Sequence, residues 1–254
     1  MTLRIIASGC CGRMGRVLSG HISRREGCRI VAGIDSAAQK YYDYPVYGDF
    51  ESCDVSADVI VDFSSPSALE PLLKYAASRD MPLVIATTGY LPEQAEAIKE
   101  ASGKIPVFYT ANMSLGINLL VELAKTAARV LGDGFDIEIV EKHHNRKIDA
   151  PSGTAHMIAN AVSKALLHES RPVYGRGRES GKRAKGDIGI HAVRGGTITG
   201  EHEIIFAGQD EVVTLGHHAS SPEIFAAGAV NAAFFIYGKQ PGLFSMADLT
   251  GGRN

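Results

Sequence analysis

The feature that most constrains the fold is a glycine-rich loop near the start of the 254-residue chain. A short apolar run, Leu3–Ala7, leads through Ser8 into Gly9-Cys10-Cys11-Gly12-Arg13-Met14-Gly15, and apolar residues then recur with helical spacing from Met14 to Arg24. A strand, a turn with regularly spaced glycines and a helix begin a βαβ unit in which the glycines allow a tight turn and close approach of a pyrophosphate. The helix N-terminus adds N–H groups for phosphate oxygens. The loop therefore predicts a dinucleotide-binding unit.

Asp35 strengthens this prediction. It ends the next β-patterned segment, Arg29–Ile34, where a ribose-binding acid is expected after such a loop. A carboxylate accepts hydrogen bonds from ribose hydroxyls and repels a 2′-phosphate, which favours NADH. Ser36 and Lys40 follow and could meet that phosphate, so NADPH and dual use stay open. A glycine-rich turn without a ligand is the less favoured alternative.

Strands and helices alternate through the first half of the chain. Continuous apolar segments at Val59–Val61, Leu83–Ile85 and Val107–Tyr109 predict buried parallel strands with helical segments between them. This pattern indicates an α/β fold with a Rossmann-type, doubly wound parallel sheet. Two segments follow strand ends at the ligand-binding edge of such a sheet, Ala86-Thr87-Thr88 and Thr110-Ala111-Asn112-Met113, and cofactor contact and ordinary loop capping explain them equally well.

The second half has a different pattern, which predicts an α+β domain for substrate binding or assembly. Its expected elements are a helix over Leu119–Val130, a strand around Ile137 and Ile139, a helix from Ser152, a polar and basic segment over Arg171–Lys185, and strands near Ile188–Arg194, Glu201–Ala207 and Glu211–His218. The last two strands are expected to form a hairpin. A buried helix from about Pro222 to Tyr237 follows.

The segment Glu141–Thr154 carries the clearest chemistry. Two histidines, His143 and His144, lie among three cationic residues that include Lys147, and Ser152-Gly153-Thr154 can start a helix that binds an anion. Histidine titrates near neutral pH and suits proton transfer, while lysine can hold a carboxylate or donate a proton. The segment fits a small polyanionic substrate beside a proton donor, although a solvated basic turn explains the spacing about as well.

Other classes of function are disfavoured by composition. A formal net charge of -2 gives no electrostatic reason to expect nucleic acid or a membrane as partner. A metal site is also disfavoured. The four cysteines lack C-x-x-C spacing, and adjacent histidines point to opposite sides of an extended chain. Because the cysteines form no disulfide framework and the start of the chain does not resemble a signal peptide, we expect a cytoplasmic location.

Taken together, these residues resemble the 4-hydroxy-tetrahydrodipicolinate reductase (dihydrodipicolinate reductase) family. Glu141–Thr154 is similar to the family signature E-x-H-H-x-x-K-x-D-A-P-S-G-T, and further similar segments run from Gly9–Arg16 to Gly242–Phe244, nearly the whole chain. The resemblance implies reduction of a small cyclic dicarboxylate, the dehydrated form of 4-hydroxy-tetrahydrodipicolinate, to tetrahydrodipicolinate in diaminopimelate and lysine biosynthesis. NADH, NADPH or both would supply the hydride.

The resemblance also implies roles for individual residues. His143 matches the proton donor or acceptor and Lys147 the proton donor, whereas His144, Gly153 and Thr154 match substrate-binding positions. The positions that match cofactor contacts are Gly9, Cys10, Cys11, Gly12, Arg13, Met14, Asp35, Ala86, Thr87, Thr88, Thr110, Ala111, Asn112 and Met113. Cys10 and Cys11 depart from the alanine and glycine common in the family's loop. Ser36 replaces a frequent arginine, which favours NADH or dual use.

The resemblance further implies the division of the chain into domains. Residues 1–114 together with 223–254 would form the dinucleotide-binding domain, and residues 115–222, with a mixed sheet, would bind substrate and assemble a homotetramer. Two other functions remain as alternatives. One is a related Rossmann dehydrogenase that acts on an amino, keto or imino acid, and the other is a sensor that binds NAD(H) without turnover.

Overall fold

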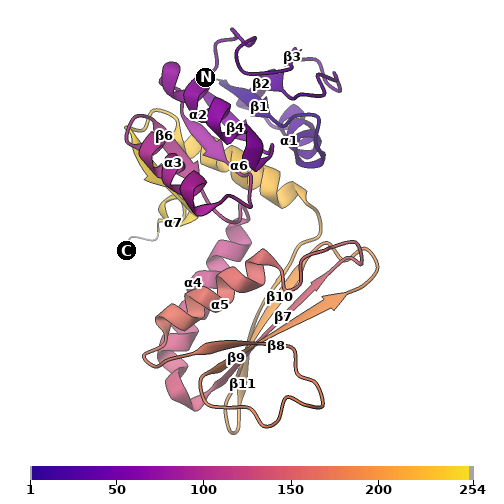
Figure 1. Ribbon diagram of the computed structural model, residues 1–254, viewed down its shortest axis with the longest axis vertical. Helices are drawn as coiled ribbons and strands as arrows, with labels where there is room; N and C mark the ends of the chain where they lie inside the picture. Colours follow the sequence, from indigo (N-terminus) through magenta and orange to yellow (C-terminus); the bar gives the residue numbers. More distant parts are fainter. Residues whose placement is uncertain (1, 252–254) are drawn as a thin grey trace. The chain divides into compact units, whose positions relative to one another are not determined.

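The computed structural model describes residues 2–251, which form two compact units (Figure 1). The first unit comprises the chain up to Ser114 and again from Pro222 onward, and the second comprises Leu115–Ser221. Residues 1 and 252–254, which the sequence analysis assigns to the first domain, lie outside the described residues. Within residues 2–251, no helix combines the length and the apolar character needed to cross a membrane.

A seven-stranded sheet forms the centre of the first unit, with strand order β12-β6-β5-β4-β1-β2-β3 and every neighbouring pair parallel. The strands are β1 (Leu3–Ser8), β2 (Cys28–Ile34), β3 (Val46–Tyr47), β4 (Val59–Asp62), β5 (Leu83–Ile85), β6 (Pro106–Tyr109) and β12 (Gly242–Phe244). The strand order reverses between β1 and β4, which is the place where doubly wound sheets bind ligands. The predicted Rossmann-type fold is therefore confirmed.

Helices cover both faces of this sheet. Side chains alternate between the two faces of the sheet along β1. Ile5 points toward the face covered by α1 (Arg13–Ser23) and α6 (Glu223–Ile236). Ile6 points toward the face covered by α2 (Leu69–Ser78) and α3 (Pro92–Ser102). Apolar side chains point to both faces, which explains why the strand sequences read as continuous apolar runs.

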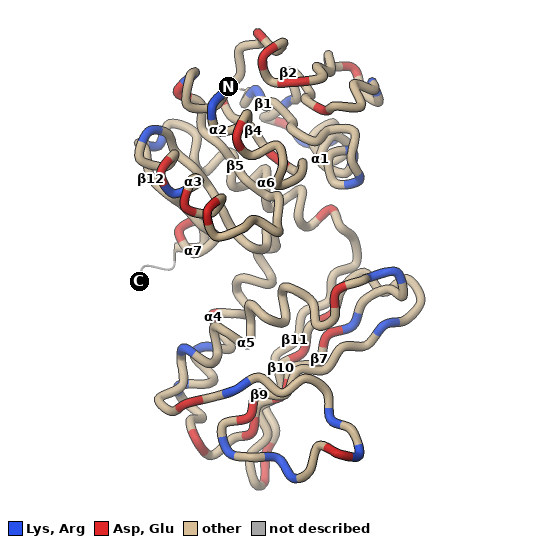
Figure 2. The backbone as a smooth tube through the Cα atoms, in the orientation of Figure 1, with Lys and Arg blue, Asp and Glu red and all other residues tan. Residues whose placement is uncertain are grey.

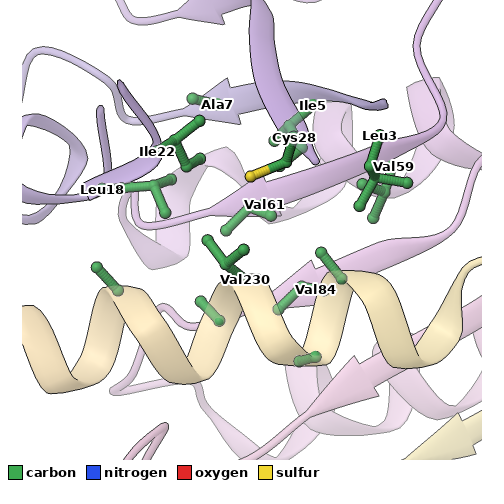
Figure 3. Close-up of a cluster of buried hydrophobic side chains, with 14 of the residues drawn as sticks. Leu3, Ile5, Ala7, Leu18, Ile22, Cys28, Val59, Val61, Val84 and Val230 are labelled. Carbon is green, nitrogen blue, oxygen red and sulfur yellow. The ribbon is translucent and has the colours of Figure 1, made fainter. Parts of the chain in front are cut away.

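The late helix α6 completes the core of the first unit. Figure 3 shows Val230 of α6 pointing toward the sheet, where the buried cluster contains Val61, Val84 and Leu18. Fully burying one such aliphatic side chain contributes about 1.5–3 kcal/mol. The segment after Pro222 is therefore an integral part of the first unit. A short helix, α7 (Met246–Leu249), follows β12.

The second unit contains a five-stranded mixed sheet with strand order β11-β10-β7-β9-β8. β7 runs parallel to β9 and antiparallel to β10, and β10 and β11 form the predicted hairpin. The strands are β7 (Asp136–His143), β8 (Arg171–Tyr174), β9 (Asp187–Arg194), β10 (Glu201–Ala207) and β11 (Val212–His218).

Helices α4 (Leu115–Leu131) and α5 (Gly153–Ala165) pack on one face of this sheet, against Ile139, Ile190 and Phe206. The opposite face carries charged and half-buried side chains such as Glu138. Figure 2 shows acidic and basic residues interspersed along these strands and their loops.

Two predictions for the second unit need correction. The amphipathic helix begins at Leu115, four residues before the predicted start at Leu119, since the first turn adds the buried Ile117. The polar segment Arg171–Lys185 begins with the strand β8. Its residues are mostly exposed and show no strand pattern, so the strand is defined by its pairing with β9.

Candidate functional site

The glycine-rich loop connects β1 to α1, as predicted, and two of its glycines are required by the geometry. Gly9 has a φ of +72°, and a Cβ atom there would lie 2.6 Å from the carbonyl oxygen of Phe63. A Cβ atom at Gly15 would lie 2.1 Å from the carbonyl oxygen of Gly9, so only glycine lets the helix start this close to the turn. The loop can therefore bring backbone N–H groups and the start of α1 against a pyrophosphate.

Asp35 lies directly beside this loop because β1 and β2 are neighbours. Its Oδ2 accepts a hydrogen bond of 2.9 Å from the backbone N–H of Cys11, and its Oδ1 accepts one of 3.0 Å from Ala37. A cavity of about 750 Å³ opens at the ends of β1, β2 and β4, and Gly9, Gly12 and Asp35 are in its wall. This volume suits a ligand of nucleotide size.

Ser36 lines the same cavity, whereas Lys40 is an exposed residue outside its wall. The wall also contains residues that the sequence analysis did not select, Ser64 and Ser65 after β4, Lys74 on α2 and Arg79 at the C-terminal end of α2. Two hydroxyls just beyond the end of a parallel strand, at the ligand-binding edge, were the available signal for the first pair.

The other predicted cofactor residues lie near the same sheet edge but outside the wall of the cavity. Thr87 is buried and Thr88 exposed after β5, and after β6 the Asn112 Oδ1 accepts a 2.8 Å hydrogen bond from the backbone N–H of Ser114. Met113 is a core residue of the first unit. Cys10 is also buried, which raises the pKa of its thiol to about 12. Arg13 is exposed at the start of α1, and Met14 is half-buried.

Asp62, at the end of β4, is a fully buried carboxyl that the sequence analysis did not assign to the site. It accepts hydrogen bonds from the hydroxyls of Ser8 at 2.6 Å, Ser64 at 2.5 Å and Thr87 at 2.6 Å. Burial raises its pKa, and these hydroxyls partly offset that effect. Asp62 thus ties together the ends of β1, β4 and β5, and it turns the side chain of Thr87 inward.

In the second unit, the signature segment is organised around Glu141, which is fully buried on β7. Its carboxylate accepts two hydrogen bonds from Arg194 on β9, at 2.7 and 2.8 Å, and one of 2.9 Å from the backbone N–H of Ser152. Burial opposes ionisation, but the bonds from Arg194 and His143 outweigh it, so the pKa of Glu141 is lowered. Arg194 also donates a 2.7 Å hydrogen bond to the carbonyl oxygen of Asp149.

His143 is oriented by this carboxylate. Its Nδ1 lies 2.6 Å from Oε2 of Glu141, and because an ionised carboxylate only accepts hydrogen bonds, Nδ1 must donate. The other ring nitrogen, Nε2, is then the atom available to give or take a proton. A Cβ atom at Gly200 would lie 3.1 Å from Nε2, so the glycine keeps space beside it.

Lys147 and the start of α5 complete this half of the site. The Nζ of Lys147 lies 2.7 Å from Oδ1 of the exposed Asp149, so the ammonium is held by a carboxylate that another carboxylate could replace. Ser152 is the N-cap of α5, and its Oγ accepts a 3.2 Å hydrogen bond from Ala155. Gly153 and Thr154 begin the first turn, whose free N–H groups form the positive end of the helix dipole. His144 is half-buried just after β7.

His202 on β10 is a further member that sequence reasoning missed. It is buried, its Nε2 lies 3.0 Å from the Oγ of Ser152, and its ring packs edge-on against that of His143 at 5.3 Å. Burial lowers its pKa to about 4, so it is neutral at neutral pH. Strand alternation could have identified it, since His202 shares a face with Ile204 and Phe206, as Glu141 shares one with Ile139.

Comparison with known proteins identifies the family. The model for the N-terminus of dihydrodipicolinate reductase matches residues 3–113, and the model for its C-terminus matches residues 116–250. The chain is 51% identical over 249 residues to 4-hydroxy-tetrahydrodipicolinate reductase of Caldanaerobacter subterraneus subsp. tengcongensis, and 98% of each chain is covered. It is 46% identical over 252 residues to the enzyme of the same name from Clostridium novyi, with 99% of each chain covered.

A solved structure leads to the same family. The dipicolinate-bound dihydrodipicolinate reductase from Paenisporosarcina sp. TG-14 superimposes with a TM-score of 0.80 at 25% identity, covering 98% of this chain and 99% of that one. A probable dehydrogenase from Thermotoga maritima shares the fold alone, with a TM-score of 0.62 at 13% identity over 98% of this chain and 93% of the other. The predicted resemblance is confirmed, and the chain belongs to the dihydrodipicolinate reductase family of oxidoreductases.

Proposed function

We propose that this protein catalyses the NADH- or NADPH-dependent reduction of the dehydrated form of 4-hydroxy-tetrahydrodipicolinate to tetrahydrodipicolinate, in the diaminopimelate pathway to lysine. Support comes from relatives of that name at up to 51% identity and from a dipicolinate-bound structural neighbour. Dipicolinate is a planar ring dicarboxylate, so a cyclic dicarboxylate is the substrate class we propose.

The observation that carries the proposal is the fixed orientation of His143. The bond of 2.6 Å to the buried Glu141 leaves Nε2 for proton transfer, and Lys147 and the start of α5 provide positive charge in the same segment. This combination suits protonation of a carbon atom in an anionic substrate.

We propose the following division of labour for the reaction. Reduced nicotinamide supplies the hydride when it is bound. His144, Lys147 and the N–H groups of Gly153 and Thr154 hold the two substrate carboxylates, with Lys147 exchanging Asp149 for substrate. Hydride addition to the conjugated carbon–carbon bond leaves an electron-rich enamine, and His143 or Lys147 donates the proton that its carbon needs.

For the cofactor, we propose that the loop from Gly9 to Met14 holds the pyrophosphate and that Asp35 binds the ribose. Ala86–Thr88 and Thr110–Met113 would contact the nicotinamide half, through backbone groups where their side chains are turned inward. The carboxylate of Asp35 in the cavity wall favours NADH, and the neighbouring Ser36 leaves room for NADPH.

We also propose a cytoplasmic homotetramer assembled through the second unit. The sheet face opposite α4 and α5 carries the half-buried Val140 and Ile205 and the exposed Val193 and Val212, apolar groups that a second sheet could cover. Sedimentation equilibrium should give a particle of four 27.1 kDa chains. A monomer at micromolar concentration would contradict this part.

A substitution of Lys147 tests the proposed reaction. Lys147→Ala should lower kcat by about 10²–10⁴-fold, because proton donation and a carboxylate partner are both lost. Its NADH affinity, measured by nicotinamide fluorescence, should stay at the wild-type value. Lys142→Ala is the matched control, since Lys142 pairs with Glu201 on the other side of β7. A collapse of NADH binding in Lys147→Ala would remove this role.

A further inference from the structure

The glycine-rich loop contains two adjacent free thiols. Cys10 is buried at 2% exposure and Cys11 is half-buried, and their Sγ atoms lie 3.9 Å apart. A Cβ atom at Gly33 would lie 2.5 Å from Sγ of Cys10, so this thiol packs directly on the backbone of β2. Packing therefore fixes the sulfur atom of Cys10, and the sulfur atom of Cys11 lies beside it in the loop.

The fold adds a carboxylate to this pair. Asp35 follows β2, the neighbour of β1, and its Oδ2 accepts the N–H bond of Cys11 at 2.9 Å. The possible ligand atoms are the Sγ atoms of Cys10 and Cys11 and a carboxylate oxygen of Asp35. These three atoms lie within 4.8 Å of one another. Spacing along the chain predicts no metal site, whereas parallel strand pairing brings Asp35 to the thiols.

The separation of the sulfur atoms matches a known coordination geometry. Zinc–sulfur bonds of about 2.3 Å in a tetrahedron place two sulfur atoms about 3.8 Å apart. Thiolates select soft or borderline cations such as Zn²⁺, and Cd²⁺ has the same filled d shell and preference. Binding would replace the 3.9 Å contact between the two thiols and break the exposed 3.1 Å contact from Cys11 Sγ to the carbonyl oxygen of Gln39.

We propose that Cys10, Cys11 and Asp35 form a binding site for a thiophilic divalent cation, with water as the fourth ligand. Two metal–sulfur bonds form as the two thiol protons pass to the buffer. The cation uses the carboxylate that we assign to the cofactor ribose, so cation and cofactor exclude each other. This second part rests on the proposed function, whereas the metal site itself does not.

Cadmium titration of the full-length, metal-free protein tests the site. The protein is reduced with a non-thiol reductant, and its four free cysteines are counted first. Cd²⁺ alone is then added while the ultraviolet thiolate-to-cadmium charge-transfer band is followed. The wild-type band should saturate at one cadmium per chain. Cys11→Ser should lose about half of the band and weaken binding by about tenfold or more, and Asp35→Asn should weaken binding while the band persists.

Cys28→Ser is the matched control, because Cys28 is a buried free cysteine outside the cluster, and it should titrate like the wild type. The absence of a saturable band in the wild type, or a wild-type titration in Cys11→Ser, would overturn the site.

NADH addition to the cadmium-loaded protein tests the competition. The band should decline as NADH binds, and zinc should raise the apparent Kd of NADH in proportion to its concentration. A constant band beside a normal NADH fluorescence signal would overturn competition. Failure of NADH to bind the metal-free protein would count against the proposed function instead and would leave the cadmium titration unchanged.

Discussion

Glu141 lies fully buried on β7, where it accepts hydrogen bonds from Arg194, His143 and Ser152. Alternation along the strand places it on the same face as Ile137 and Ile139, inside the unit. A buried carboxylate is costly unless it is paired, and here the guanidinium of Arg194 satisfies both of its oxygens. Glu141 is therefore a positioning residue for His143.

Replacing Glu141 with glutamine tests this role. Glu141→Gln should lower kcat by about 10–100-fold, because His143 loses its fixed acceptor. Steady-state kinetics measure this effect, and nicotinamide fluorescence should show unchanged NADH binding.

Glu203→Gln is the control, because Glu203 lies on the opposite, half-exposed face of β10. A Glu141→Gln variant that keeps the wild-type kcat would contradict this role, and a loss of NADH binding would indicate structural damage.

His202 predicts a pH dependence of stability. Burial lowers its pKa from 6.5 to about 4, so between these values the unfolded chain binds a proton that the folded protein does not. The free energy of unfolding therefore falls as pH decreases from 6.5 to about 4, by up to about 3 kcal/mol from this group. Urea unfolding at several pH values should show a shallower fall in His202→Gln.

The exposed His218 provides the control, and His218→Gln should keep the wild-type dependence on pH. Equal slopes in wild type and His202→Gln would contradict this account of His202.

At the scale of residues, sequence reasoning selected groups whose chemistry is visible by type, such as His143, Lys147 and Asp35. It did not select Glu141, Asp62, Arg194 or His202, although Glu141 lies in the signature segment. The reason is physical, since a charged residue in a strand is taken to face water. Register and burial decide that question, and both depend on partners distant in the chain.

At the scale of elements, the start of α1 determines the geometry of the predicted cofactor loop. Gly15→Ala would place a methyl group 2.1 Å from the carbonyl oxygen of Gly9, which is backbone and cannot move aside. We expect a loss of about 1–3 kcal/mol in the free energy of unfolding, together with weaker NADH binding. Chemical denaturation and fluorescence titration measure the two effects.

Gly20→Ala in the same helix is the comparison. Its Cβ would meet only side-chain ends, at 3.3 and 3.6 Å, so it should be neutral or stabilise the helix by up to about 1 kcal/mol. Equal destabilisation by both substitutions would contradict the requirement for glycine at position 15.

The helices could be predicted from their apolar period, and the central parallel strands from their continuous apolar runs. Predicted ends at Glu201–Ala207 agree with β10, and Ser152 is the cap of α5 as expected. The short strands β3, β8 and β12 could not be predicted, because each lies at a sheet edge and is defined by pairing with a neighbour. Their side chains are exposed or half-buried, so these segments lack the buried apolar run that marks a central strand such as β5.

At the scale of the whole molecule, the first unit combines the start of the chain with its last segment. Alternating strands and helices predict the sheet, but nothing local shows that α6 packs on it. The expectation that the final helix returns to the first domain came from the family resemblance. The division of labour between a cofactor unit and a proton-transfer unit remains our proposal, and it leads to the central claim of reductase activity.

The most direct test is to follow absorbance of the reduced nicotinamide while purified protein meets the product of a dihydrodipicolinate synthase reaction. NADH and NADPH are tested side by side, and the synthase is omitted in the control. The account predicts oxidation that depends on the synthase, with NADH used at least as well as NADPH. A protein that binds NADH but oxidises neither cofactor would contradict the account and would favour another imino or amino acid dehydrogenase.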